Sequence, residues 1–409
     1  MEIILIKSLN EKIIMELDKV INLINEEELL DILKDLIRIP GHVNCEGQEK
    51  EISLHVAAVL EKEKIHTKLQ EVELGRKNVI GRIYGKNKGK SLALNGHLDT
   101  VPPNDSMKNY EPNICVGRIY GLGSSDMKGA VAAMLYSLIL IKRTRTELDG
   151  DLYFTGVIGE ESGGTGTRFL INSGFKPDYA VVGEPTSLNI VNSHKGCFLV
   201  DVTIEGKAAH ASIPQKGANA IAAMGNFICK INNEYVPKLN KRIQEGAGSP
   251  TISFGIINGG GKVNIVADHC VLNIDRRWIT SESNEIIIPE LEKYLKDVCS
   301  QNADLKYSIV PALPPEGYFG PFFIPESHEL VKMSKEAVIF SGRKPEVTSM
   351  SGWTDGATIL HAGIPTVILG PGNMEQAHTA DEWINISEVI DAVKVYLSLI
   401  FQICANKKD

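Results

Sequence analysis

The chain has 409 residues, of which 43% are hydrophobic and 23% are charged, and its formal net charge is −8. This length allows two domains with a sizeable core each, and the composition is that of an ordinary globular protein. Nucleic acids and anionic membranes select an excess of Lys and Arg, so the acidic balance predicts neither of them as a partner.

The sequence gives no sign of export or of membrane insertion. The first residues, MEIILIKSLNEK, lack a long apolar core and a small-residue cleavage site, so we expect no signal peptide. No apolar run approaches the roughly 18 to 20 residues that a membrane helix needs. The seven cysteines are odd in number and form no CxxC pair, which favours reduced thiols and argues against a cysteine-bound zinc. These features predict a cytoplasmic protein.

Short apolar runs dominate the first half of the chain. Residues from about 10 to 75 predict two helices and a strand, divided by the loop RIPGHVNCEGQEKE. Beyond them, apolar runs alternate with amphipathic helices, which predicts an α/β domain with a mostly parallel sheet covered on both faces. Ligands bind such sheets beyond the carboxyl ends of the strands. The runs are SLALNGHLD, DLYFTGVIGEE, YAVVGEP and PTVILGPG.

The stretch from 195 to 310 has a different pattern. Its strands and helices follow the order β-α-β-β-α-β, which is typical of a ferredoxin-like α+β domain. We therefore expect an inserted domain at 195–310 and a catalytic domain formed by 1–194 and 311–409.

His97 ends the first of the apolar runs, and Asp99 follows two residues later. In an extended chain both side chains point to the same side. A metal-bound histidine usually donates its second ring N–H to a carboxylate, and a His-x-Asp pair suits that arrangement. Taken alone, the pair fits a loop histidine beside a solvated aspartate at least as well.

Four further segments place polar side chains near predicted strand ends. Asp126 precedes a helix, where it could be an N-cap or a carboxylate shared by two metal ions. Glu160 and Glu161 would point to opposite sides, so one could bind a metal while the other faces the substrate water. Glu184 ends the next run, and His378 lies in GPGNMEQAHTADEW. Surface polarity is the alternative for the glutamate pair and for the histidine.

Two histidines with three carboxylates form a ligand set that suits zinc, cobalt or manganese. Two-metal hydrolases commonly share one carboxylate between ions about 3.5–4 Å apart. We therefore expect two divalent metal ions, with zinc first and cobalt or manganese as the alternatives.

Six ordered segments, spread over most of the chain, resemble one known family. The resemblance is to the acetylornithine deacetylase, succinyl-diaminopimelate desuccinylase and carboxypeptidase G2 family of di-zinc peptidases and aminoacylases. Each segment is weak alone, whereas the ordered combination is specific. One departure is Gly159, where many relatives carry Asp before the glutamate pair. The segments are GHLDTVP, GLGSSDMKGA, GEESGGTGT, VVGEPT, KAAHAS and QAHTADE.

The resemblance implies a role for each candidate metal ligand. His97, Asp126 and Glu184 would hold one ion. Asp126, Glu161 and His378 would hold the other. The resemblance further implies that the Asp126–Met127 peptide bond is cis.

The resemblance also assigns catalytic roles. Asp99 would accept a hydrogen bond from His97, and Glu160 would be the general base. His210 of the inserted domain would stabilise the developing oxyanion. Family members pair through the inserted domain, so we expect a homodimer formed there.

Three residues are expected to contact a small-molecule substrate. NIDRRWI predicts a strand whose two arginines face opposite sides, and the resemblance places the carboxylate-binding one at Arg277. A surface ion pair with Asp275 is the alternative for Arg277. Asn264 resembles a second position near the same cleft, and Thr354 lies in SGWTDGAT, which resembles a substrate loop.

Together these features predict a metal-dependent hydrolase that cleaves an amide bond of a small carboxylate-bearing substrate, such as an N-acyl amino acid. A di- or tripeptidase of the same superfamily is the alternative within enzymes. A non-catalytic relative that binds a metabolite is the alternative of another class, and it would be expected to have lost a ligand or the base.

Overall fold

The computed structural model describes residues 11–104, 110–312 and 319–405. Contacts within the chain divide it into two units. The second unit extends past residue 311, where the catalytic domain was expected to resume, because Phe319 still pairs with Cys197 of that unit. Unit 1 comprises Met1–Asn192, Ile324–Thr348 and Thr354–Asp409, and unit 2 comprises Ser193–Phe323 and Ser349–Trp353.

A nine-stranded sheet, in the order β1-β2-β6-β3-β7-β15-β8-β13 with β14 paired to β8, contains the central strands of unit 1. The predicted α/β class is confirmed, but the sheet is mixed. The central strands β6, β3, β7 and β15 run parallel to one another and are the four predicted apolar runs, whereas β1, β2, β8 and β13 pair antiparallel. The bounds are β1 (His66–Glu73), β2 (Arg76–Ile83), β3 (Leu92–His97), β6 (Leu152–Val157), β7 (Tyr179–Val182), β8 (Ile190–His194), β13 (Phe322–Phe323), β14 (Val347–Met350) and β15 (Thr366–Ile368).

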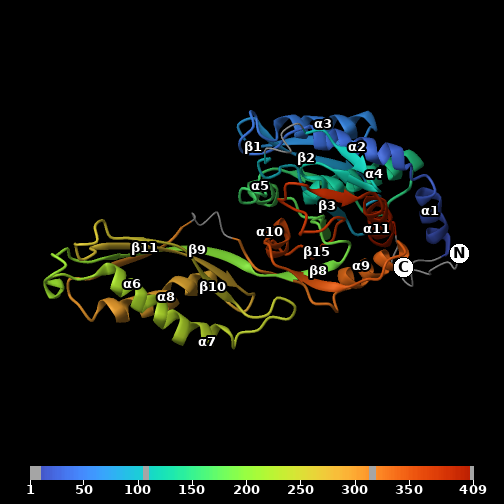
Figure 1. Cartoon of the computed structure of the whole chain (residues 1–409). Coiled ribbons are helices and arrows are strands. Elements are labelled where there is room, and N and C mark those ends of the chain that lie inside the picture. Colours follow the sequence, from blue (N-terminus) through green and yellow to red (C-terminus); the bar gives the residue numbers. More distant parts are fainter. Residues whose placement is uncertain (1–10, 105–109, 313–318, 406–409) are drawn as a thin grey trace. The chain divides into compact units, whose positions relative to one another are not determined.

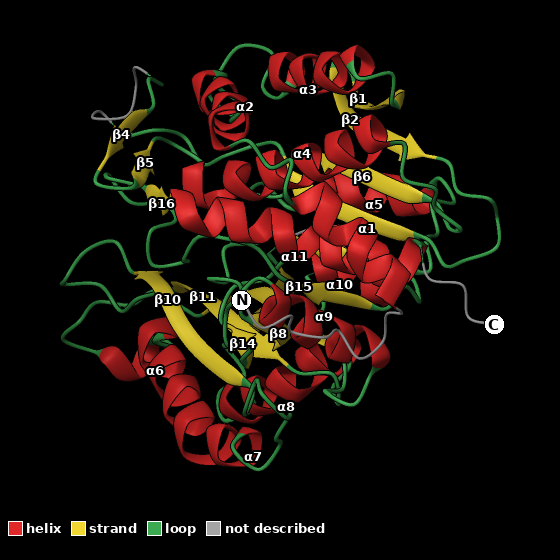
Figure 2. Cartoon of the chain, turned by 90° about the vertical axis from the view of Figure 1, so that its right-hand side faces the viewer, coloured by secondary structure: helices red, strands yellow, loops and turns green. Residues whose placement is uncertain are grey.

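Helices cover the central sheet, as Figures 1 and 2 show. Every residue of α4 from Gly129 to Ile141 is buried, which is why the helix is apolar on all sides. It packs against α2 and α11. The bounds are α1 (Glu11–Ile21), α2 (Glu26–Arg38), α3 (Lys50–Lys62), α4 (Gly129–Thr144), α5 (Thr165–Asn172), α9 (Glu329–Phe340), α10 (Asp355–His361) and α11 (Ile386–Cys404).

The region from about 10 to 75 contains three helices, so the prediction of two helices there is wrong. The reason is a helix boundary at Asn25, whose side chain accepts a hydrogen bond from the backbone N–H of Glu28 at 3.1 Å. This cap starts α2 at Glu26, five residues after α1 ends at Ile21.

One helical stretch among the described residues, Ser124–Thr144, is long and apolar enough to cross a membrane by length and composition. Its apolar window is entirely buried inside the structure, as a core helix would be.

A small three-stranded sheet, in the order β16-β5-β4, lies beside the segment that carries Asp126. The backbone N–H of Gly121, directly after β5, donates to the carbonyl of Glu382, directly before β16. This sheet therefore joins the Asp126 segment to the chain after His378. Its bounds are β4 (Asn113–Cys115), β5 (Arg118–Tyr120) and β16 (Trp383–Asn385).

Unit 2 has the predicted ferredoxin-like order. Its four strands form an antiparallel sheet in the order β10-β11-β9-β12, and apolar side chains of β9 and β11 pack against α6 and α8. Strand β10 lies at an edge of this sheet. The bounds are β9 (Gly196–Glu205), α6 (Ala220–Lys230), α7 (Val236–Leu239), β10 (Thr251–Gly259), β11 (His269–Trp278), α8 (Ile287–Cys299) and β12 (Lys306–Pro311).

Candidate metal centre

The parallel strands of unit 1 bring the predicted ligands to one edge of the sheet. His97 is the last residue of β3 and pairs with Val157, the last residue of β6. Glu161 follows β6, and Glu184 follows β7 by two residues. His378 lies in the loop that follows β15. Because these strands are parallel and neighbouring, their carboxyl ends meet.

Asp126 lies at the centre of this cluster. Its Oδ1 is 3.1 Å from His97 Nε2, and its Oδ2 is 3.4 Å from His378 Nε2. Glu184 Oε2 lies 4.0 Å from His97 Nε2, and Glu161 Oε1 lies 3.0 Å from His378 Nε2. The two oxygens of Asp126 thus face two different histidines, each of which has a second carboxylate beside it. The peptide bond after Asp126 is cis.

Asp99 holds both His97 and the glutamate pair. His97 Nδ1 lies 2.9 Å from the carbonyl oxygen of Asp99 and 3.7 Å from its carboxylate, so the carbonyl is the nearer acceptor. The carboxylate instead accepts the backbone N–H groups of Glu160 at 3.1 Å and of Glu161 at 3.0 Å. Asp99 therefore orients the imidazole through its main chain and the glutamate turn through its side chain.

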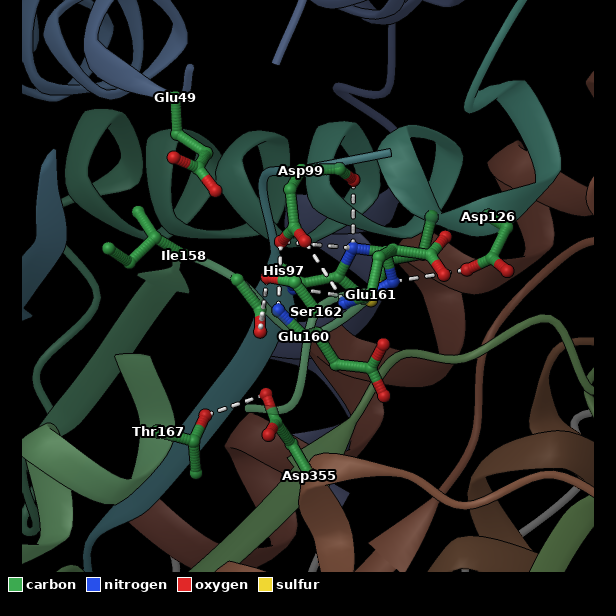
Figure 3. Close-up of polar contacts among 12 residues, drawn as sticks. Glu49, His97, Asp99, Asp126, Ile158, Glu160, Glu161, Ser162, Thr167 and Asp355 are labelled. Carbon is green, nitrogen blue, oxygen red and sulfur yellow. Dashed lines mark hydrogen bonds and ion pairs between the residues drawn. The ribbon is translucent and has the colours of Figure 1, made fainter. Parts of the chain in front are cut away.

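The two glutamates lie in a turn after β6 and not in the extended chain that was expected, and their side chains still take different directions. Figure 3 shows Glu161 beside Asp126 and Glu160 on the side nearer Asp355. Burial raises the pKa of Glu160 well above its usual range, and the Glu184 and Asp355 carboxylates raise it further. These surroundings favour the protonated carboxyl group more than water does.

The electrostatics of the cluster fit a divalent cation. Burial raises the pKa of Glu184 well above its usual range, and its Oε1 is buried with no hydrogen-bond partner among the described residues. Hydrogen bonds to Asp126 and Glu161 raise the pKa of His378 to about 10. An unpaired buried carboxylate oxygen is costly unless a cation compensates it. One donor atom each of His97, Asp126 and Glu161 lies within 4.8 Å of the others, close enough for a single ion.

The residues at the start of α10 are buried beside the cluster. Thr354 is 1% exposed, and its hydroxyl accepts the backbone N–H of Gly356 at 3.2 Å as the helix N-cap. The Asp355 carboxylate accepts a hydrogen bond from the Thr167 hydroxyl at 2.7 Å (Figure 3). The Thr354 hydroxyl, which was predicted to contact substrate, therefore caps the N-terminus of α10 in the structure.

The remaining candidates belong to unit 2. His210 is exposed, its Nδ1 lies 2.7 Å from the Ser212 hydroxyl, and the neighbouring Ala211 N–H donates to the Asn264 carbonyl at 3.1 Å. Arg277 makes two parallel hydrogen bonds to Asp275, both of 2.9 Å. The structure thus pairs Arg277 with the acid that the alternative interpretation named.

His210 and Arg277 lie at opposite ends of β11. His210 bridges to Ile265, before the strand begins at His269, whereas Arg277 is its penultimate residue. Eight residues of extended strand span about 26 Å. A small substrate therefore cannot contact both side chains of the same copy of unit 2.

Sequence reasoning missed Glu382, a buried carboxylate whose oxygens accept the backbone N–H groups of Gly123, Ser125 and Asp126. These contacts join residues more than 250 positions apart. The sequence segment QAHTADE contains this glutamate, but no local pattern indicates a backbone partner.

A sequence profile of Peptidase family M20/M25/M40 matches residues 93–402, which include all the candidate metal ligands. An acetylornithine deacetylase of Proteus mirabilis is 31% identical over 327 residues, covering 78% of this chain and 80% of that protein. An N-formyl-4-amino-5-aminomethyl-2-methylpyrimidine deformylase of Halalkalibacterium halodurans is 28% identical over 433 residues, covering 98% of this chain and 99% of that protein.

Among solved structures, a tripeptidase of Staphylococcus aureus superposes with a TM-score of 0.78 at 26% identity, covering 92% of this chain and 98% of that one. The family profile spans both the catalytic unit and the inserted unit, and the curated relatives extend the match over nearly the whole chain. The chain therefore belongs to peptidase family M20/M25/M40, as the six ordered segments predicted, and is a hydrolytic enzyme that acts on amide bonds.

Proposed function

We propose that this enzyme removes the acyl group from a small N-acyl amino acid that carries a free carboxylate, with two divalent metal ions in the Asp126 cluster. Zinc is the first candidate, and cobalt or manganese are the alternatives. The observation that carries the proposal is the placement of the two Asp126 oxygens against His97 and His378, at 3.1 and 3.4 Å. A carboxylate facing two histidines in this way suits a bridge between two ions.

In this proposal His97, Asp126 and Glu184 hold one ion, and Asp126, Glu161 and His378 hold the other. The unpartnered Glu184 oxygen would be a ligand atom of the first ion. The His378 ring nitrogen and the Glu161 oxygen beside it would be ligand atoms of the second. When bound, the ions acidify a water molecule and polarise the amide carbonyl.

The side chains of the protein then move the protons. Glu160 removes a proton from the water as its oxygen attacks the amide carbon, and delivers that proton to the leaving nitrogen when the C–N bond breaks. His210 donates a hydrogen bond to the carbonyl oxygen as it becomes negative. The products are a carboxylic acid and an amine, so the atoms of one water molecule are consumed.

The choice of an acylated amino acid over a peptide rests on the relatives. A deacetylase and a deformylase align along most of the chain, whereas the tripeptidase enters through structural superposition. A non-catalytic metabolite-binding relative would lack the base or a ligand, and this chain retains both. The seven unpaired cysteines favour a reducing compartment, and we place the enzyme in the cytoplasm.

Hydrolysis assays with zinc or cobalt test the substrate class directly. The purified enzyme should hydrolyse one or more of N-acetyl-, N-formyl- and N-succinyl-amino acids faster than it hydrolyses di- and tripeptides. Faster cleavage of tripeptides would replace the proposal by the peptidase alternative, and hydrolysis of none of them would contradict it.

A second copy of the chain completes the proposed site. His210 lies beside the segment that precedes β11 and Arg277 lies near the end of that strand, so one of the two must come from another copy if both contact one substrate. The edge strand β10 and its hairpin expose apolar side chains, and such an edge favours pairing with a second sheet. The exposed residues are Ile256, Ile257, Val263, Ile265 and, on α6, Ile221. We therefore propose a homodimer through unit 2, with His210 acting on the partner's metal centre.

Replacing His210 by Ala is expected to lower kcat about 100-fold without loss of bound metal, because a donor to the developing oxyanion is removed. Mixing this variant with Glu160→Ala under exchange conditions should restore about a quarter of the parental activity, since half of the dimers then carry one intact site. Unchanged kcat in His210→Ala would remove its catalytic role. Failure of the mixture to regain activity would show that His210 serves its own chain.

Arg277, Asn264 and Thr354 are the proposed substrate contacts, and the planar fork of Arg277 suits the substrate carboxylate. Replacing Arg277 by Lys should lower kcat/KM at least about tenfold, because a point charge cannot reproduce two parallel hydrogen bonds. A substrate whose carboxylate is replaced by an amide should lose most kcat/KM on the parental enzyme and little more on the variant. Additive losses would mean that Arg277 serves only its ion pair with Asp275, which is present in the structure.

A further inference from the structure

One buried carboxylate holds the chain segment that carries Asp126. Glu382 is 1% exposed, and its Oε1 accepts the backbone N–H groups of Ser125 at 2.8 Å and of Asp126 at 2.9 Å. Its Oε2 accepts the N–H of Gly123 at 2.8 Å. Both oxygens are therefore engaged by backbone N–H groups at and shortly before Asp126.

A second connection joins the same two segments. The Ser125 hydroxyl donates to the carbonyl of Asn373 at 3.1 Å and accepts the N–H of Asn373 at 3.1 Å. His378 lies between Asn373 and Glu382 in the sequence, so its loop is fastened to the Asp126 segment at both ends. The two connections therefore fix the backbone around Asp126 and around His378. The side chains of these two residues lie close together, with Asp126 Oδ2 3.4 Å from His378 Nε2.

The other proposed ligands are held by different means. His97 is the last residue of β3, and Glu184 directly follows the Gly183 N–H that donates to the Asn95 carbonyl at 3.0 Å. The central sheet therefore positions these two side chains. Among the described residues, the hydrogen bonds of the Glu382 carboxylate are made to the segment that carries Asp126, and Ser125 links that segment to the His378 loop.

We propose that Glu382 is a positioning residue, which sets the affinity of the metal site formed by Asp126, Glu161 and His378. This inference rests on the proposed metal centre and adds a residue that contacts neither metal nor substrate. Loss of a group that orients a metal ligand typically weakens metal binding about 10- to 100-fold.

Zinc titration of metal-free protein, in competition with a chromophoric chelator, tests the inference. The variant is Glu382→Gln, which keeps the shape of the side chain but presents an N–H₂ group to one of the backbone N–H donors. The control is Glu375→Gln, an exposed carboxylate in the same loop. His378→Ala identifies which of the two binding events belongs to the affected site.

In Glu382→Gln we expect the event that His378→Ala abolishes to weaken about 10- to 100-fold, and the other event, which shares only Asp126 with it, to weaken by a smaller factor. Glu375→Gln should bind zinc as the parental chain does. Unchanged affinities in Glu382→Gln would overturn the inference. Equal weakening of both events, together with a lower melting temperature of the zinc-free protein, would also overturn it, because Glu382 would then serve the fold alone.

Ser125→Ala provides the second variant if Glu382→Gln does not fold. It removes both hydrogen bonds to Asn373 and leaves the Glu382 carboxylate in place. The same selective weakening of zinc binding is expected, and unchanged binding would count against the positioning role. A parental chain that binds no zinc would contradict the metal centre itself, whereas equal binding by chain and variants would contradict only the role of Glu382.

Discussion

Glu160→Ala is expected to lower kcat by at least about 100-fold, which is the low end of what a general base contributes. The variant should keep its bound metal. The expectation rests on the direction of the side chain. The Glu160 carboxylate is on the side nearer Asp355, and its backbone N–H is fixed by Asp99 at 3.1 Å. Burial raises the pKa of Glu160, so its carboxyl group can both take a proton from water and return it to the amine.

Glu161→Ala is the matched comparison, because the two glutamates are neighbours held by the same Asp99 carboxylate. Glu161 Oε1 lies 3.0 Å from His378 Nε2, so its removal should lower metal content as well as rate. Metal analysis beside steady-state kinetics separates the two roles. Loss of metal in Glu160→Ala, with retention in Glu161→Ala, would mean that the base and the ligand are interchanged.

Asp126→Ala is expected to abolish measurable turnover, with at least a 1,000-fold fall in kcat/KM, because both proposed metal sites share this side chain. Two-metal stabilisation is worth several kcal/mol, and about 4 kcal/mol corresponds to roughly that factor. The variant should also retain less than one zinc ion per chain. Elemental analysis after dialysis and kinetics with excess zinc measure the two effects.

The same variant should lose the stabilisation that zinc gives the parental protein. A ligand at a concentration 1,000-fold above its Kd raises the free energy of unfolding by about 4 kcal/mol. Zinc should therefore raise the melting temperature of the parental chain and have little effect on Asp126→Ala. A variant that binds two zinc ions with parental affinity would show that Asp126 is not a ligand; it is not the N-cap of α4 either, since Lys128 occupies that position.

The sequence predicted the strands that form the site because the signal was local. Three of the four central strands are short apolar runs that lead to Gly and a polar residue, the fourth is followed within a few residues by His378, and parallel neighbours bring such residues together. The ferredoxin-like unit was predictable for a similar reason, since its six elements alternate in a short continuous stretch. Family membership rested on ordered segments, and the comparisons confirm it.

What the sequence did not reveal depends on distant partners. The outer strands β1 and β2 run antiparallel, and no feature of the four apolar runs indicates that the sheet is mixed at its edges. The boundary between α1 and α2 depends on a single cap at Asn25. Glu382 escaped notice because its partners are backbone N–H groups, which every sequence offers at every residue except proline.

The substrate residues illustrate a further limit. Alternation along a strand correctly separated the two arginines, since Arg276 is fully buried against Glu282 while Arg277 is partly exposed. Alternation cannot tell whether the exposed arginine binds a substrate or its neighbour Asp275. The span of about 26 Å from His269 to Arg277 likewise became visible only once β11 had defined ends.

Anomalous scattering from a zinc-soaked crystal tests the central claim most directly. We expect two peaks within about 4 Å of each other, with the Asp126 carboxylate between them. One should lie beside His97 and Glu184, and the other beside Glu161 and His378. Peaks elsewhere in the molecule, with these five side chains far from any metal, would contradict the account of this protein as a two-metal amide hydrolase.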